Sequence, residues 1–167
     1  MKRKPSAAKD FYSDGRKLLD VGLFDGAAYN FGRALRLNSK DLYALAGKAE
    51  ALLGLCEMLL SRNQKFKAHL LLNAADRLCD RARKINDAIP TPWFVKAEIR
   101  RLKGQYEAAL GYYARSLRLD DKNVAAWRGK AACHKKLGQL QEATGCLKKS
   151  EEILAKQRRQ DYLDEEE

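Results

Sequence analysis

Proline is scarce in this chain of 167 residues: there are three, and two of them, Pro90 and Pro92, lie close together. Long stretches therefore contain nothing that would break a helix. No run reaches the roughly 18 apolar residues of a membrane span, and residues 1–6 lack the apolar core of a signal peptide. These absences predict a soluble helical protein of the cytoplasm, with the nucleus as the alternative.

Residues suited to metal binding, disulfides or catalysis are few and dispersed. The four cysteines lie far apart without a Cys-x-x-Cys pair, and only two histidines are present. His134 follows Cys133 directly, but adjacent helical residues point about 100° apart and cannot share a metal ion by themselves. No glycine-rich phosphate loop or Ser/His/Asp grouping occurs. The sequence predicts a protein that is not an enzyme and needs no metal or cofactor, with cysteines as small buried side chains.

Positive charge is in excess, since 33 Lys and Arg against 22 Asp and Glu give a formal net charge of +11. Basic residues are concentrated in 2–4 and 148–159, whereas 164–167 are all acidic. The net charge favours attraction to acidic peptides, nucleic acid or an anionic membrane, and does not select among them.

Two segments headed by tryptophan repeat in register, 34 residues apart. The first starts Trp-Phe-Val-Lys-Ala-Glu-Ile at Trp93, and the second starts Trp-Arg-Gly-Lys-Ala-Ala-Cys at Trp127. The same columns of small and large residues recur in residues 8–41. A fixed period of this length indicates stacked supersecondary units, here pairs of antiparallel helices. Small residues such as Ala97 and Ala131 should then lie against a neighbouring helix.

A fourth unit, residues 42–89, is longer than the others. Its two small-residue columns, at Ala49 and Ala75, are 26 residues apart, against 12 in the other units. Divided equally, the excess adds about two turns to each helix and leaves the apolar face unrotated. We expect a longer hairpin that projects from the stack and turns at residues 61–64. Its apolar face should comprise Leu55, Leu59, Leu60, Phe66 and Leu70 to Leu72. We expect the two helices to cover this face themselves; docking of a partner or a second copy is the alternative.

Local signals delimit the helices. Gly22, Gly104 and Gly138 should end the first helix of their units. Thr91-Pro92 and Asn123 should begin helices. The last helix should run to about Arg159 and cap the stack. The predicted organisation is a disordered basic tail (1–7), a repeat domain (8–160; units at about 8–41, 42–89, 90–123 and 124–157) and an acidic tail (161–167). Folding of the acidic tail onto a basic groove is a further hypothesis.

These columns resemble the tetratricopeptide repeat, whose pattern of Trp, Gly, Tyr, Ala, Phe and Pro is nearly matched by residues 90–157. The resemblance covers residues 8–156 and departs from the pattern in three places: the insertion, the missing prolines at two junctions, and Arg100 and His134 where the pattern has an aromatic residue. It implies an all-α fold, a right-handed superhelical solenoid of four antiparallel helix pairs. It also implies a protein-interaction adaptor whose concave groove, lined by the first helices of the units, binds an extended or helical peptide.

Eight residues at the inward positions of the repeat form the candidate partner-binding groove: Lys9, Tyr12, Arg16, Tyr43, Phe94, Arg101, Arg128 and Lys135. Aromatic anchors beside cations suit a peptide with apolar anchors and acidic flanks. The cations concentrate in the last two units, so the acidic part of the peptide should lie there.

Three alternatives concern the partner. The carboxylate clamp of repeats that bind chaperone tails is not matched, because its places hold Tyr12, Arg16, Gly47, Thr91 and Val95. Nucleic acid, RNA in particular, is the second candidate partner, but the inward columns change from unit to unit, unlike those of a base-reading repeat. Self-association is left open between a monomer and a weak homo-oligomer.

Overall fold

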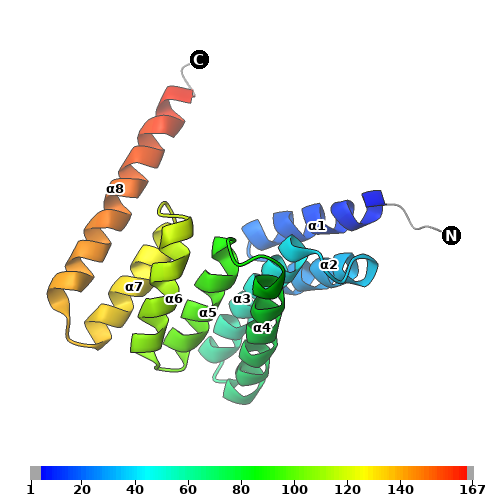
Figure 1. The fold of residues 1–167 in the computed structure, drawn as a ribbon, viewed down its shortest axis with the longest axis horizontal. Coiled ribbons are helices and arrows are strands. Elements are labelled where there is room, and N and C mark those ends of the chain that lie inside the picture. Colours follow the sequence, from blue (N-terminus) through cyan, green and yellow to red (C-terminus); the bar gives the residue numbers. More distant parts are fainter. Residues whose placement is uncertain (1–4, 165–167) are drawn as a thin grey trace.

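The computed structural model describes the backbone of residues 5–164 and the side chains of residues 7–160. This part of the chain is helical and contains no strand. Its elements are α1 (Pro5–Asp20), α2 (Phe24–Leu37), α3 (Leu42–Ser61), α4 (Lys65–Ile85), α5 (Pro90–Leu102), α6 (Tyr106–Leu119), α7 (Val124–Lys136) and α8 (Leu140–Asp164). Figure 1 shows antiparallel pairs stacked in chain order. The predicted all-α solenoid is confirmed.

The stack bends toward one side. We call α1, α3, α5 and α7 the A helices and the helices that follow them the B helices. Each A helix contacts the next A helix, whereas no B helix contacts the next B helix within the described residues. The A helices therefore lie closer together and form the inner, concave side of the curve. Each B helix packs against the A helix that follows it, and we call these contacts the first (α2–α3), second (α4–α5) and third (α6–α7) joints.

All four A helices end in the same way. Gly22, Gly104 and Gly138 have φ of 75°, 73° and 75°, and Asn63 takes the equivalent place in the longer unit with φ of 57°. In each case the next amide donates to a carbonyl five residues back, as in Leu23 to Leu18 at 2.8 Å. This left-handed cap favours glycine, or asparagine as its common substitute. The prediction for the three glycines is confirmed.

The turns between units also repeat. Asn38, Asn86 and Asp120 each accept a hydrogen bond on Oδ1 from the amide two residues later, at 3.2, 2.8 and 3.1 Å. Trp93 and Trp127 donate their indole N–H to the carbonyl six residues earlier, at 2.7 and 2.8 Å. Each tryptophan therefore closes the turn that precedes its own helix, which explains its recurrence at this position.

Three helix ends differ from the sequence expectation. The first helix begins at Pro5, so the assignment of residues 5–7 to the tail was wrong; the rest of that tail, 1–4, lies outside the described residues. The helix α5 begins at Pro90 rather than at Thr91-Pro92, because proline suits the first helical position. The helix α8 reaches Asp164, since nothing after Arg159 interrupts it, and residues 165–167 are not described. Asn123 caps α7 as predicted, accepting from the amide of Ala126 at 2.9 Å.

Large and small side chains face each other across the joints. At the first joint Phe31 is buried and an added Cβ on Gly47 would lie 2.6 Å from its ring. At the third joint Tyr113 is buried directly against Gly129. At the second joint the equivalent columns hold Cys79 and Val95, both buried in one cluster. A large side chain on one helix is thus matched by a small one on the next, or the reverse. Ala97 and Ala131 are buried, as predicted.

The longer unit has the predicted helices, with 20 residues in α3 and 21 in α4 against 13 and 14 in α5 and α6. Leu59, Leu60, Leu71 and Leu72 pack in its core. The prediction was wrong for Phe66 and Leu70, which are 78% and 53% exposed. Both lie on the side of α4 opposite the buried residues Ala68, Leu72 and Ala75.

Candidate functional site

The candidate site is the A-helix face, the concave surface formed by α1, α3, α5 and α7. Side chains from consecutive A helices meet on it because those helices touch. It carries most of the residues that the repeat pattern places inward. Its two halves, α1–α3 and α5–α7, differ in how their charges are paired.

The first half combines aromatic rings with an ion pair. The rings of Tyr12 and Tyr43 meet edge-on with centroids 6.4 Å apart, and Tyr43 is 61% exposed. Arg16 contacts Glu50 of the next A helix at 3.4 Å and Asp20 of its own helix at 3.1 Å. Burial raises the pKa of Glu50, and the charge and hydrogen bond of Arg16 oppose that rise. Arg16 is therefore already ion-paired, while the tyrosine rings, mainly that of Tyr43, leave an apolar surface accessible to a ligand.

The second half contains a buried polar cluster. Tyr113 donates its hydroxyl to Glu98, whose second oxygen accepts from Arg101. Arg101 also reaches Glu57 of α3 at 3.6 Å. Burial raises the pKa of Tyr113, and the charge of Glu98 raises it further. Burial alone would lower the pKa of Arg101, but its bonds to Glu98 outweigh this and raise it. This cluster fixes Arg101 in place and neutralises it.

The remaining cations of the A-helix face are exposed. Lys9, Arg128 and Lys135 have no carboxylate within ion-pair distance among the side chains that the structure describes. Arg128 borders a hollow between α5 and α7, whose lining is Glu98, Arg101, Val124, Ala125, Arg128, Gly129 and Ala132. Lys135 lies two turns further along α7. An incoming anion would find its accessible positive charge at Arg128 and Lys135.

The structure brings the predicted groove residues together in two groups. Tyr12, Arg16 and Tyr43 form one, and Arg101 and Arg128 share the hollow of the second. Phe94 is half-buried, with its ring centroid 6.4 Å from that of Tyr113, so it packs inside the stack more than it faces the groove. Lys9 and Lys135 lie near opposite ends of the face.

Two functional features were missed. Glu57 was not assigned to the groove because the repeat pattern does not extend into the insertion, yet it follows Glu50 by seven residues and so shares its helix face. The second was the buried Lys96 at the second joint, which donates to Asp76 at 2.5 Å and Asp80 at 2.8 Å. Arg100 adds a contact to Asp76 at 3.2 Å. The sequence did contain a signal for this network: two acids lie four residues apart on α4, and two bases lie four residues apart on α5.

The cysteines of the described chain lie in its interior. All four cysteines are buried, and burial raises the pKa of the Cys79 thiol to about 12 and of Cys56 and Cys133 to about 11. These thiols are protonated at neutral pH and are poor nucleophiles. No group of three metal-ligating side chains occurs among the described residues. None of the described helices has the length and apolarity needed to cross a membrane.

Comparison with known proteins agrees with this geometry. Residues 101–163 match the family model described as tetratricopeptide repeat. A thermophilic TPR protein of Thermus thermophilus is similar over 90% of this chain and 75% of its own, at 20% identity and a TM-score of 0.74. MamA is similar over 93% of this chain and 83% of its own, at 16% identity and a TM-score of 0.64. No curated protein matches the sequence.

A further solved structure is the first TPR of Spaghetti (RPAP3) bound to the HSP90 peptide SRMEEVD. It is similar over 83% of this chain and 98% of its own, at 18% identity and a TM-score of 0.61. At these identities the likeness concerns the fold.

Proposed function

We propose that this chain, which matches the tetratricopeptide-repeat model over residues 101–163, is a non-enzymatic adaptor that binds a partner peptide on its A-helix face. The repeats supply a stacked scaffold for protein interactions. The observation that carries the proposal is the division of the face into a tyrosine pair, with Tyr43 exposed and Tyr12 half-buried, and a separate pair of exposed cations, Arg128 and Lys135. A binding surface needs both an apolar anchor site and a group that fixes orientation.

The peptide proposed here carries an apolar side chain for the tyrosines and an acidic residue for Arg128 and Lys135. The rings of Tyr12 and Tyr43 contact each other directly and edge-on, so together they present an apolar surface to the peptide. Arg16 and Arg101 contribute less than the sequence pattern suggests, because Glu50, Glu57 and Glu98 already neutralise them. The acidic end of the peptide therefore lies toward α7, and its apolar end toward α1.

The partner proposed is not the carboxylate tail of a chaperone. Two of the places that the clamp requires hold Gly47 and Val95, which are both buried and bear no donor on their side chains. Arg128 can hold a carboxylate in a different geometry, with the hollow beside it as the receiving space. We further propose a reducing compartment, the cytoplasm or the nucleus, because the buried cysteines serve as packing residues.

The test is an affinity capture with the immobilised chain, comparing wild type with the double variant Tyr43→Ala and Arg128→Glu. Both side chains are exposed, so the fold should be retained. The matched control is Tyr29→Ala with Arg118→Glu, which makes the same chemical changes on B helices. Captured proteins are identified, and the peptides that contact the chain are located by cross-linking.

The proposal requires partners that bind wild type and the control but lose at least about tenfold affinity for the groove variant. Their cross-linked segments should contain an apolar residue near an acidic one. Retention of every partner by the groove variant would place binding on another surface. Binding that falls steeply with salt for any RNA sequence would support the nucleic-acid alternative instead.

A further inference from the structure

The end of the longer hairpin carries positive charge without negative charge. We call residues 58–70 the hairpin tip; it comprises the last turn of α3, the connecting turn and the start of α4. No Asp or Glu occurs between Glu57 and Asp76, whereas Arg62, Lys65 and Lys67 are all exposed. The two flanking acids face elsewhere, since Glu57 contacts Arg101 and Asp76 contacts Lys96. The tip is thus a local source of positive potential.

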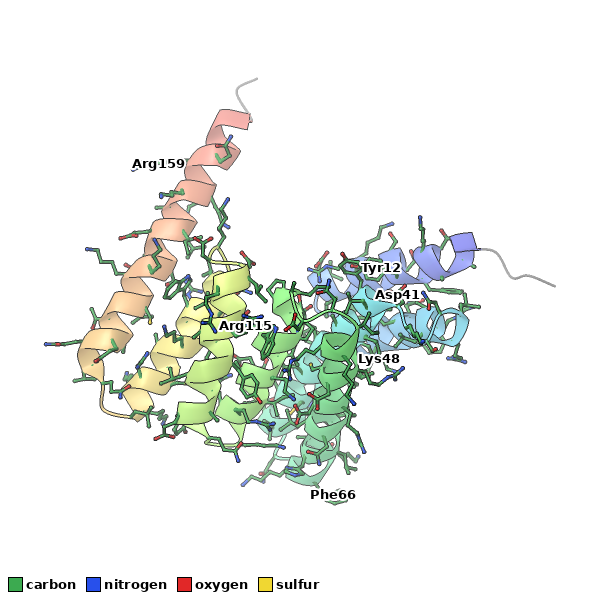
Figure 2. All side chains as sticks on the ribbon, viewed as in Figure 1. Tyr12, Asp41, Lys48, Phe66, Arg115 and Arg159 are labelled. Carbon is green, nitrogen blue, oxygen red and sulfur yellow. The ribbon has the colours of Figure 1, made fainter. Side chains whose placement is uncertain are left out.

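The same tip exposes apolar side chains. Phe66 is 78% exposed, Leu70 is 53% exposed and Met58 is 39% exposed. Phe66 and Leu70 are four residues apart, so they lie one turn apart on the same outward side of α4. Figure 2 shows Phe66 at the far end of the hairpin, directed away from the rest of the molecule. The other leucines of the insertion pack internally, so this stripe has no covering element within the described chain.

The insertion is what creates this surface. The helices α5 and α6 have 13 and 14 residues, whereas α3 and α4 have 20 and 21 and extend past them. Lys103, at the end of α5, joins Lys65 and His69 around a shallow hollow at the base of the tip. The cations therefore surround the apolar residues on more than one side.

We propose that the hairpin tip is a peripheral membrane-binding site for an anionic phospholipid surface. Phe66 would enter the level of the headgroups, while Lys65 and Lys67 bury their aliphatic stems and place their ammonium groups at the phosphates. Arg62 supplies a further contact to the same layer. A protruding apex fits a flat surface, whereas a protein partner would need a pocket shaped around it. Charge complementarity selects anionic over neutral lipid.

The test is co-sedimentation of the full chain with vesicles of phosphatidylcholine alone or with roughly one-third phosphatidylserine. Wild type should partition at least about tenfold more strongly onto the anionic vesicles. The double variant Lys65→Glu and Lys67→Glu should lower that partition by at least about 25-fold, because each basic residue near the surface contributes about fivefold and the new carboxylates are repelled by the anionic lipid. Phe66→Ser should lower it by about tenfold, through loss of apolar burial.

Matched controls separate a local site from general attraction. Lys148→Glu with Lys156→Glu produces the same change in net charge on α8, and Leu140→Ser removes another exposed apolar side chain, 64% exposed. Each control should change the partition by less than about twofold. Circular dichroism should confirm that all variants fold, as expected for exposed positions.

Three outcomes overturn the proposal. The first is equal partition onto neutral and anionic vesicles, and the second is equal losses in the tip variants and their controls. The third is failure of wild type to bind vesicles; if the tip variants then also lose an acidic protein captured by wild type, the tip is a protein-docking site.

Discussion

The first and third joints of the stack differ from the second in how two helices are fitted together. In the first and third, an aromatic side chain of the B helix fills the place left by a glycine on the next A helix. In the second, the aromatic is replaced by Cys79 and the glycine by Val95, and a buried ion-pair network surrounds Lys96. One repeat geometry therefore accepts two solutions, provided that the total volume across a joint is conserved.

The largest expected effect comes from replacing the aromatic–glycine pair of the first joint with the cysteine–valine pair found at the second. Phe31→Cys should lower the free energy of unfolding by about 3 kcal/mol, because it leaves a cavity beside Gly47. Gly47→Val alone should lower it by about 2 kcal/mol through overlap with the ring. Together they reproduce the second joint, so the double variant should be more stable than the sum of the singles by at least about 1 kcal/mol. Urea denaturation of the four proteins measures this; strict additivity would refute volume matching.

Removing the charge at the second joint should have the next largest effect. Lys96→Met leaves Asp76 and Asp80 facing each other without their shared cation, at a cost of about 2 kcal/mol. The value is set below that of a fully buried pair because Asp80 is half exposed. Thermal unfolding at neutral pH measures it. A variant as stable as wild type would show that the network contributes nothing to the joint.

The same network predicts a pH dependence. Burial would raise the pKa of Asp76, but Lys96 and Arg100 outweigh it and hold the pKa below its ordinary value. A carboxyl with a lowered folded-state pKa stabilises the protein above its unfolded pKa, about 3.9, and loses that contribution as pH falls through the folded value. Wild type should therefore lose stability below about pH 4 more steeply than Lys96→Met. If acid titrations show that the two proteins lose stability with the same slope, the prediction is contradicted.

The smallest effects should distinguish glycines that receive a partner from glycines that do not. Gly129→Ala places a methyl group against Tyr113 and Glu98 and should destabilise the third joint by about 1–2 kcal/mol. Gly145, inside α8, has nothing within 4 Å of an added Cβ. Gly145→Ala should therefore stabilise the protein by up to about 1 kcal/mol, as expected for a helix interior. Calorimetry measures the unfolding midpoint of each variant. If Gly129→Ala and Gly145→Ala shift it in the same direction, the two kinds of glycine do not differ.

Features governed by local chemistry could be read from the sequence. The glycines that end the A helices, the cap at Asn123 and the equal division of the insertion between α3 and α4 all follow from residues within a turn or two. The buried alanines followed from the repeat, because a column of small residues marks a close helix contact.

Features governed by the packing of neighbouring units could not be read in the same way. The repeat pattern places Arg16 and Arg101 on the inner face but does not show that Glu50, Glu57 and Glu98 neutralise them, since those pairs span helices or depend on burial. The exposure of Phe66 was missed because an apolar residue in a leucine-rich segment was assigned to the core without its angular position on α4.

The joints also bear on how the chain acquires its structure. Within the part of the chain that the structure describes, each helix contacts only helices one or two places away in the chain. Few loops must close before favourable contacts form, so we expect rapid folding that can start in any unit and spread outward. Unfolding should begin at the two terminal pairs, α1–α2 and α7–α8, because each of them has a neighbouring pair on one side only. Amide hydrogen exchange should therefore be slowest near α4 and α5 and become faster toward either terminus.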